Sequence, residues 1–341
     1  MLKNINHYIN KNMSKAVVLF SGGLDSVIVI KLLQEQNIDV TALYIENGFH
    51  KGNKDKYLKD LASKLNVKLV IKDSRSEFFD MWKEPKYGYG KAMNPCVNCH
   101  ALMTNIALNF MDEINADFVA SGEVLEQRGF SQTTHQMKKV IKLIERPEKI
   151  LRPLSAKSMK ATQMEKDNLV DRELLLNIKG KSRKIQYELL SKYGLKKDEV
   201  EVPAGGCILA EPGIKKKVEG LDIEKLKLED FEVFKYGRQC LVDGVKFVLS
   251  RDRYEMKQLN KYNVDKGSFV KVTTNEIKSP MGLLDLTSEE LNDFITNFKK
   301  DERIIKLLDN VKEKIKGFVK FENLDTYFKI KIESNFNVIE W

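Results

Sequence analysis

Apolar and polar positions in the first part of the chain follow two alternating rhythms. Short runs rich in β-branched residues, at 15–20 (KAVVLF), 40–45 (VTALYI) and 68–73 (KLVIKD), predict strands. Between them, 24–36 and 56–65 have the length and apolar spacing of helices. Strands that alternate with helices are typical of βαβ units, so this part predicts a doubly wound parallel α/β sheet.

The same rhythm continues further along the chain. A helix is predicted from about Cys99 to Asn115, followed by a strand at 117–122 (DFVASG). The sequence RPLS at 152–155 predicts the end of another strand.

The local amino-acid composition changes after residue 207. Residues 211–230 begin with Pro-Gly and are dense in charge, which is typical of a connector. We therefore place a domain boundary near residue 220, giving domains 1–220 and 221–341.

The second domain predicts a smaller α+β module. Residues 231–250 read as two strands around the turn Val242-Asp243-Gly244, and a helix follows from Tyr254. Residues 267–274 predict another strand. The tail carries a helical apolar stripe at 304–321 and an alternating strand at 326–332.

Composition narrows the protein class. The chain has 341 residues, of which 42% are hydrophobic and 31% charged, so it is globular rather than disordered or fibrous. A net charge of +9 favours a polyanionic partner such as nucleic acid. Because no apolar run suits a signal peptide or a membrane span, we expect a cytoplasmic protein with no membrane partner. Four cysteines are too sparse for a disulfide framework.

A phosphate-binding loop is predicted where the first strand meets the first helix. Backbone N–H groups, hydroxyls and the positive helix end converge there on one anion. Glycines let the backbone approach the phosphate, and an aspartate can hold Mg²⁺. An ordinary glycine-rich turn is the alternative, but the complete SGGLDS favours phosphate. The predicted ligands are Ser21, Gly22, Gly23, Asp25 and Ser26.

Cysteines are grouped at a predicted helix start. In NPCVNC, Asn94 is placed as the N-cap and Pro95 as the first helical residue. Cys96 and Cys99 then share a face, and the helix N-terminus is expected to lower their pKa. Cys207, in the glycine-rich PAGGC, could bring a third thiolate across the nucleotide cleft.

Other readings of these cysteines stay open. A structural zinc site would need a fourth ligand, from His100 or Cys240, and three unrelated buried thiols are also possible. We expect His100 and His135 to be structural and Cys240 to be a small buried hydrophobe.

Polar residues beyond the strand at 117–122 predict the lining of a cleft. Open α/β sheets bind ligands at the carboxyl ends of their strands. We expect Gly122, Arg128, Ser131 and Gln132 to line this cleft. ATP phosphates or an RNA backbone could be contacted by a further set, for which a solvated surface is the alternative: Arg152, Ser155, Lys181, Arg183 and Lys184.

SGGLDS resembles the pyrophosphatase loop, or PP-loop, of the N-type ATP pyrophosphatases. These enzymes split ATP to AMP and pyrophosphate and adenylate a carbonyl oxygen. The resemblance implies ATP and Mg²⁺ as cofactors and Asp25 as a catalytic residue. It also implies that backbone groups of Tyr44 and Ile45, at the end of the second strand, hold adenine. Simple strand core is the alternative for these two residues.

Several segments are similar to the tRNA sulfur-insertion branch of this family: NPCVNC, DFVASGEVLEQRGFSQ, LRPLSAK, GKSRK and PAGGC. The resemblance implies a tRNA uridine sulfurtransferase that needs a sulfide or persulfide donor. It implies Cys96, Cys99 and Cys207 as ligands of a [4Fe-4S] cluster whose free iron carries hydrosulfide. A Cys99 persulfide resolved by Cys207 is the second route, and Cys99 and Cys207 are catalytic in either.

The second domain resembles an RNA-binding module of ribosome-quality-control proteins, on KYGRQCLVDGVKFVLSRDRYEMKQL. A basic, strand-rich module suits phosphate contacts to a large RNA. Whether the product is 4-thiouridine or 2-thiouridine stays open. An AMP-forming ligase or amidotransferase with a structural zinc site is the alternative enzyme, and an RNA-binding protein with a relict loop is the non-enzymatic alternative.

Overall fold

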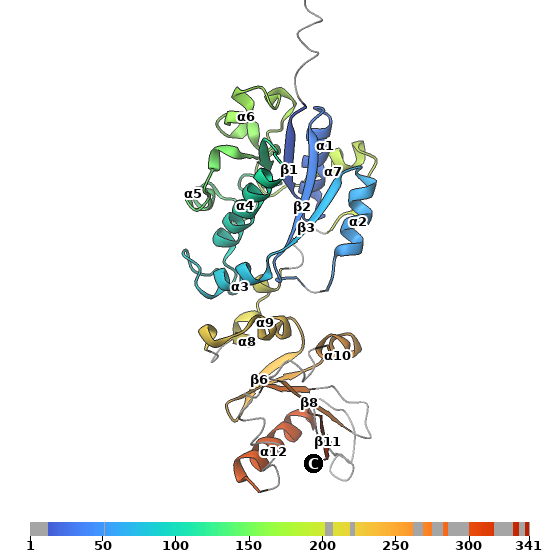
Figure 1. The fold of residues 1–341 in the computed structure, drawn as a ribbon, viewed down its shortest axis with the longest axis vertical. Coiled ribbons are helices and arrows are strands. Elements are labelled where there is room, and N and C mark those ends of the chain that lie inside the picture. The colour runs from blue at the N-terminus through green and yellow to red at the C-terminus, as the bar shows by residue number, and fades with distance from the viewer. Residues whose placement is uncertain are drawn as a thin grey trace, which may run out of the picture. The chain divides into compact units, whose positions relative to one another are not determined.

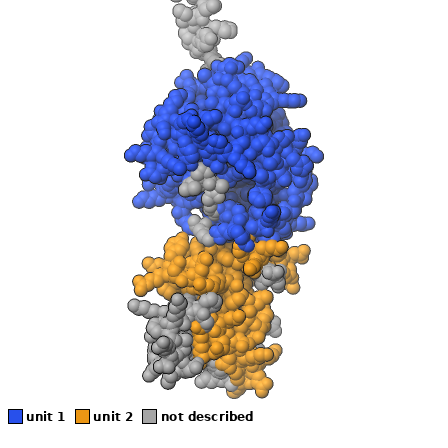
Figure 2. Space-filling view, turned by 180° about the vertical axis from the view of Figure 1, so that it is seen from behind, with its two compact units in different colours: residues 1–212 blue, residues 213–341 orange. Residues whose placement is uncertain are grey.

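A computed structural model shows two compact units, residues 1–212 and 213–341, coloured separately in Figure 2. The predicted boundary near residue 220 lies outside the described residues, so the domains 1–220 and 221–341 stay a prediction. The structure describes residues 13–50, 52–201, 207–218, 222–261, 269–274, 282–285, 300–316, 330–333 and 338–340.

The first unit is built on a parallel sheet with the strand order β3-β2-β1-β4-β5. This confirms the predicted doubly wound α/β fold, and the first three strands lie where their β-branched runs predicted them. The strands are β1 Lys15–Leu19, β2 Asp39–Glu46, β3 Lys68–Asp73, β4 Phe118–Ala120 and β5 Ile150–Leu151.

Helices cover both faces of this sheet, with α4 on one face and α1, α2 and α7 on the other (Figure 1). The apolar run in α1 is buried along almost its whole length, because it packs on the centre of the sheet. The helices are α1 Leu24–Gln34, α2 Asp55–Lys64, α3 Arg75–Lys83, α4 Cys96–Glu113, α5 Thr134–Ile141, α6 Gln163–Lys166 and α7 Lys184–Lys192. Short 3₁₀ turns lie at Pro147–Lys149, Ala156–Ser158, Arg172–Leu174, Lys197–Glu199 and Ile208–Ala210.

The sheet changes winding direction at its central strand, β1. This strand pairs with β2 on one side, where Leu19 is opposite Leu43, and with β4 on the other, where Val18 is opposite Ala120. The loops that follow β1 and β4 therefore emerge side by side at the carboxyl edge, which is where open α/β sheets bind ligands.

The second unit contains an antiparallel sheet with the strand order β11-β10-β8-β9-β7-β6. It is the predicted smaller module of mixed helices and strands. Its strands are β6 Arg238–Val242, β7 Val245–Leu249, β8 Phe269–Thr274, β9 Gly282–Asp285, β10 Ile330–Glu333 and β11 Val338–Glu340. Its helices are α8 Ile214–Val218, α9 Leu228–Phe234, α10 Arg253–Leu259 and α12 Glu302–Lys316, with a 3₁₀ turn at Ile223–Lys225.

One strand prediction was wrong in this unit. Phe231 and Phe234, expected in a strand, belong to α9, and their rings meet edge to face with centroids 6.3 Å apart. Both side chains are fully buried, and a short apolar run that is buried all round does not distinguish a helix from a strand. The predicted turn is present, with Asp243 and Gly244 both at positive φ between β6 and β7.

Among the described residues, no helix is both long enough and apolar enough to cross a membrane.

Candidate functional site

The PP-loop lies between β1 and α1, as predicted, and is held from outside by α2. Gly22 has φ +77°, a conformation that favours glycine, and a Cβ there would lie 2.6 Å from the Tyr57 ring. The Tyr57 hydroxyl donates to the Gly22 carbonyl at 2.7 Å and accepts from the Glu201 backbone N–H at 2.8 Å. Tyr57 thus fixes the loop and the Glu201 segment together.

Serine hydroxyls complete the turn of the loop. The Ser21 hydroxyl accepts from the Gly23 N–H at 3.2 Å, and the Ser26 hydroxyl donates to the Gly23 carbonyl at 2.9 Å. Ser21 is exposed, whereas Ser26 is buried under the loop. The loop therefore starts at an accessible hydroxyl and ends in a buried one.

Gly122, just beyond β4, lies against the PP-loop. A Cβ at this position would be 3.0 Å from the Asp25 carbonyl carbon and from the Ser26 nitrogen. Only glycine lets the two loops approach this closely without a shift. This is a physical reason for the predicted involvement of Gly122.

Gly122→Ala is expected to push the β4 loop away from the PP-loop. Overpacking of this kind costs about 1–3 kcal/mol, so the variant should unfold at lower denaturant and bind ATP more weakly. Chemical unfolding and calorimetric ATP titration measure the two effects. Gly213→Ala is the matched control, because a Cβ there meets no described atom within 4 Å. Equal behaviour of the two variants would contradict the packing argument.

Asp25 is clamped by two buried glutamines. Gln127 Nε2 donates to Asp25 Oδ2 at 2.9 Å, and Gln186 Nε2 donates to Asp25 Oδ1 at 3.4 Å. Gln186 Nε2 also donates to Gln127 Oε1 at 2.9 Å, which closes the triangle. Burial raises the pKa of Asp25 above its usual range, while the two amides and the nearby Arg183 and Arg128 oppose that shift. The Asp25 carboxylate is thus held in one orientation and is largely shielded from water.

Arg128 connects the PP-loop with the cysteines. Its guanidinium interacts electrostatically with Asp25 on one side and with Cys96 and Cys207 on the other. Arg183 is a second cation near both Asp25 and Arg128. Burial lowers the pKa of Arg128, and the neighbouring Arg183 adds to this. Two half-buried guanidiniums beside one carboxylate leave excess positive charge, which suits a polyphosphate.

Three cysteines gather at this place. Electrostatic interactions link Cys99 with both Cys207 and Cys96. The Cys207 segment is anchored by the Ile208 N–H, which donates to the Phe49 carbonyl beyond β2 at 2.9 Å. All four cysteines of the chain are free thiols. The predicted grouping of Cys96, Cys99 and Cys207 in one part of the fold is therefore present.

The expected pKa effect of the helix start was wrong. Burial raises the pKa of Cys96 and Cys99 above the usual range, and that of Cys207 to about 11. Desolvation of a thiolate outweighs the helix N-terminus here, so the thiols are protonated at neutral pH. The neighbouring thiols raise the pKa of Cys99 further, whereas Arg128 lowers that of Cys96.

The start of α4 also differs from the prediction by one residue. Pro95 occupies the cap position and Cys96 is the first helical residue. Asn94 does not cap the helix, because its Nδ2 donates to the Cys96 sulfur at 3.1 Å. The Cys99 N–H donates to the Pro95 carbonyl at 2.9 Å, so both cysteines lie in the first turn.

The spacing of the three thiols decides whether they can hold a metal ion together. Within the described part of the chain, no group of three His, Cys, Asp or Glu side chains is close enough to hold a metal ion. The thiols are near neighbours, yet they do not form a ligand set in this arrangement. The [4Fe-4S] cluster stays a prediction.

A buried ion network lies behind the cysteines. Glu123, 7% exposed, accepts from Arg152 Nε at 2.8 Å and lies 2.8 Å from His100 Nδ1. Arg152, followed by the His100 interactions, holds the pKa of Glu123 far below its usual range in spite of burial. Because His100 directly follows Cys99 on α4, this network fixes the helix start relative to β4 and β5. Arg152 is thus a structural partner rather than a solvated cation.

The proposed adenine residues lie at the end of β2, and both are buried. In a parallel strand, alternate residues direct their backbone groups to opposite neighbours. The Leu43 carbonyl accepts from the Phe20 N–H on the β1 side at 2.8 Å. The backbone groups of Ile45, two residues further on, therefore face the same side, beyond the end of β1. The backbone groups of Tyr44 face β3. Its side-chain hydroxyl donates to the Glu46 carboxylate at 3.4 Å. Of the two, Ile45 has the backbone suited to a ligand.

Other predicted residues have structural contacts. Gln132 closes its own loop, since its N–H donates to the Arg128 carbonyl at 2.9 Å. The Ser155 hydroxyl donates to the Ile178 carbonyl at 2.7 Å. Cys240 lies in β6 of the second unit, half-buried, and its sulfur is 3.6 Å from the Phe247 carbonyl. Ser131 is buried, whereas Lys181, Lys184 and His135 are exposed.

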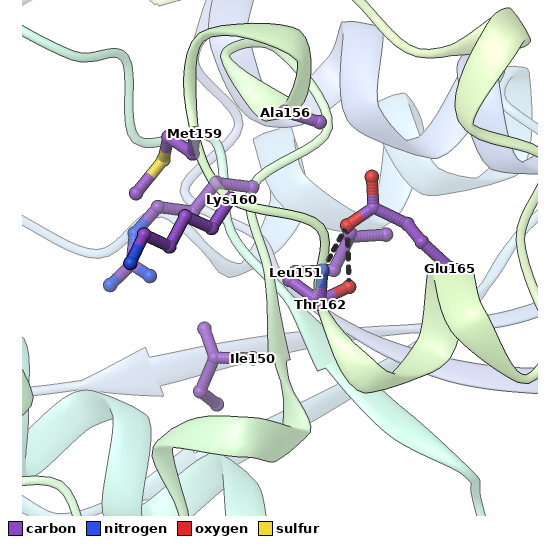
Figure 3. A pocket seen from close by; sticks show the side chains of 8 residues that line it. Ile150, Leu151, Ala156, Met159, Lys160, Thr162 and Glu165 are labelled. Atoms are coloured by element: carbon purple, nitrogen blue, oxygen red, sulfur yellow. Dashed lines mark hydrogen bonds between the residues drawn. The ribbon is translucent and has the colours of Figure 1, made fainter.

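A small cavity lies beyond the end of β5 (Figure 3). In this view the Glu165 carboxylate accepts from the backbone N–H and hydroxyl of Thr162, at 2.6 and 2.7 Å. Arg152 belongs to its wall and also to the ion network, so the cavity adjoins the site without including Asp25 or the thiols. Its lining residues are Ile150, Leu151, Arg152, Ala156, Met159, Lys160, Thr162 and Glu165.

Sequence reasoning missed the residues that position the PP-loop, which are Gln127, Gln186 and Tyr57. It also missed Glu123, which fixes the start of α4. Gln127 directly precedes the predicted Arg128, and Gln186 is a fully buried amide on α7. A polar residue on the buried face of a predicted helix was the available signal for Gln186.

Residues 14–149 match the family model described as "tRNA methyl transferase HUP domain". The chain is 34% identical over 126 residues to the tRNA-specific 2-thiouridylase MnmA of Sulfurimonas denitrificans, covering 34% of this chain and 37% of that protein. It is 31% identical over 137 residues to the tRNA-specific 2-thiouridylase MnmA 1 of Clostridium tetani, covering 36% and 38%. The matches span little more than a third of the length of these relatives.

Two solved structures have a low similarity to the chain. A 4-thiouridine synthetase in complex with RNA and bound ATP shares 19% sequence identity with a TM-score of 0.34, covering 65% of this chain and 52% of that chain. The NMN synthetase of Francisella tularensis shares 14% with a TM-score of 0.34, covering 73% and 83%. The chain is thus similar to this HUP domain over residues 14–149, and to two tRNA-specific 2-thiouridylases over 126 and 137 residues.

Proposed function

We propose that the chain is an ATP-dependent tRNA uridine sulfurtransferase. The observation that carries this proposal is the position of Arg128, whose guanidinium interacts with Asp25 of the PP-loop and with the thiols of Cys96 and Cys207. A nucleotide-cleaving loop and a group of thiols thereby share one site. That combination fits a reaction in which ATP activates an oxygen and sulfur replaces it.

The first step is adenylation. The uracil carbonyl oxygen attacks the α-phosphorus of ATP, the bond to the β-phosphate breaks, and pyrophosphate leaves. Ser21, Gly22, Gly23 and Ser26 form the loop that would bind the pyrophosphate, with Asp25 as the ligand for its Mg²⁺. Arg128 and Arg183 would stabilise the charge that develops on the phosphates. Adenine would lie at the backbone of Ile45.

The second step is displacement. A sulfur nucleophile attacks the activated carbon, and AMP leaves with the former carbonyl oxygen. In the persulfide route, the outer sulfur on Cys99 attacks, and Cys207 then attacks the Cys99 sulfur. A Cys99–Cys207 disulfide forms and thiouridine is released, so a thiol reductant must restore the pair. Cys207 lies near enough to Cys99 to raise its pKa, and this proximity supports the pairing.

The cluster route assigns Cys96, Cys99 and Cys207 as ligands, and a cluster would supply hydrosulfide at its open iron. The described thiols do not form a ligand set in their present arrangement. The raised pKa of each thiol means that either route must deprotonate them when substrate or metal arrives.

Mass spectrometry of tRNA nucleosides from a deletion strain tests the function directly. Loss of one thiouridine, restored by the intact gene, is expected, and its identity distinguishes 2-thiouridine from 4-thiouridine. Unchanged nucleosides, together with AMP formation on a small carboxylate or amide, would favour the AMP-forming ligase or amidotransferase instead.

The proposal includes tRNA binding by basic residues. Lys215 and Lys216 are exposed on α8, in a chain of net charge +9. Changing both to Ala is expected to weaken tRNA binding and to reduce the slope of log affinity against log salt by about 1 to 2, since fewer counterions are released. A filter-binding titration at several salt concentrations measures the slope.

The matched control is Lys59→Ala with Lys68→Ala, which removes two exposed lysines from the first unit. Equal slopes for the two double variants would show that tRNA responds to overall charge and not to α8.

A further inference from the structure

An exposed aromatic side chain lies in the loop that carries Arg128. Phe130 is 51% exposed, although large apolar side chains in this unit are mostly buried. It is separated by only one residue from Arg128, the cation between Asp25 and the thiols. An exposed aromatic ring two residues from Arg128 is available for a ligand.

The loop holding Phe130 is fixed by hydrogen bonds. The Glu126 N–H donates to the Gln132 carbonyl at 2.8 Å, and the Gln132 N–H donates to the Arg128 carbonyl at 2.9 Å. The Glu126 carboxylate accepts from the backbone N–H and hydroxyl of Thr134, at 2.8 and 2.7 Å. Phe130 is therefore presented by a braced turn, and its exposure does not reflect a loose end.

The turn beside Phe130 is not crowded by other segments, since a Cβ built on Gly129 would meet no described atom within 4 Å outside its chain neighbours. A second exposed apolar side chain, Ile185, is 49% exposed and follows the other cation, Arg183, by two residues. Each arginine near Asp25 thus has an exposed apolar side chain two residues further along the sequence, and positive charge combined with aromatic or apolar surface is what single-stranded nucleic acid binds.

We propose that Phe130 is a stacking platform for the target nucleobase, which the enzyme extrudes from the RNA. This inference rests on the proposed function and deepens it. An enzyme that does chemistry on a base takes it out of its stack, and an aromatic face replaces the lost stacking. Arg128 and Arg183 hold the phosphates, while Phe130 holds the base whose carbonyl meets ATP. Phe130 is thus a binding residue for the RNA substrate.

Thiolation kinetics with unmodified tRNA and the full chain test this platform. Phe130→Ala is expected to lower kcat/KM for tRNA by about 5- to 100-fold, the range for loss of one stacked base. Phe130→Tyr and Phe130→Trp should stay within about threefold of the parent protein, and Phe130→Leu should behave like the Ala variant. Leu174→Ala, which removes a side chain that is 52% exposed, is the control and should change nothing.

Fluorescence distinguishes RNA stacking from a purely structural role, because a structural residue would not respond to added tRNA. In Phe130→Trp, tRNA should quench the new indole, whereas the indole of Leu174→Trp should keep its emission. Both are compared with the parent, which contains Trp82 and Trp341.

Failure of the proposed function and failure of the stacking platform would give different experimental results. Absence of thiolation by the parent protein would overturn the proposed function, and the quenching arm would still decide whether Phe130 stacks on RNA. Parental kcat/KM in Phe130→Ala, full activity in Phe130→Leu, or no quenching would overturn the platform. Loss of ATP affinity in Phe130→Ala would also overturn it, because Phe130 would then support the phosphate loop.

Discussion

Asp25→Asn is expected to lower AMP and pyrophosphate formation by at least ~100-fold, a loss typical of removing one essential electrostatic group. Both Asp25 oxygens accept hydrogen bonds, from Gln127 and Gln186. An Asn side chain offers one acceptor and one donor, so it loses both the charge for Mg²⁺ and one of these contacts. AMP and pyrophosphate release with tRNA present measures the effect.

The fold should tolerate this change. An acid whose pKa is raised in the folded state loses stability as the pH rises past its unfolded value, here 3.8. Asn cannot ionise, so it avoids this cost at neutral pH, which offsets the lost hydrogen bond. The melting temperature should stay within about 4 °C of the parent. Asp39→Asn, at the exposed amino end of β2, is the control. Near-parental turnover of Asp25→Asn at matched stability would remove Asp25 from the mechanism.

The raised pKa of Asp25 also predicts the acid limb of the rate profile. Mg²⁺ binding needs the carboxylate, which forms only above the raised pKa. Activity should therefore begin to fall, as the pH decreases, at a higher pH than an exposed aspartate would give.

Cys99→Ala and Cys207→Ala are each expected to reduce thiouridine formation on the order of a thousandfold or more, because both proposed routes need these thiols. ATP cleavage should persist, since neither thiol belongs to the PP-loop. Thiouridine is measured by nucleoside mass spectrometry, and AMP is measured in the same reactions. Cys240→Ala, in β6 of the second unit, is the matched control and should retain both activities.

Cys96 separates the two sulfur routes. The cluster route predicts that Cys96→Ala loses sulfur transfer together with iron and the broad absorption near ~400 nm of an anaerobic preparation. The persulfide route predicts that Cys96→Ala stays active and that a colourless protein is active. Zinc in place of iron, with no sulfur transfer by the parent, would contradict both and favour a structural site.

The sequence by itself determined the alternating strands and helices of the first unit. The strand at 68–73 coincides with β3, and the helix at 24–36 contains α1, because the β-branched runs and the long apolar run are each compatible with one element. It also determined the PP-loop, since Ser21 to Ser26 are contiguous and their geometry follows from the strand and helix on either side. The short buried run of α9 lacked such a signal, and there the strand prediction was wrong.

Only the tertiary structure decided what surrounds those residues. The amides that clamp Asp25 come from positions 102 and 161 residues away, and no local pattern links them to the loop. The pKa of the thiols is a second property that local sequence did not predict. The place of Cys96 and Cys99 at a helix start predicted a lowered pKa, yet burial raised it. Sequence spacing fixes local backbone geometry, whereas desolvation depends on every segment packed around a group, and this is known only once the chain has folded.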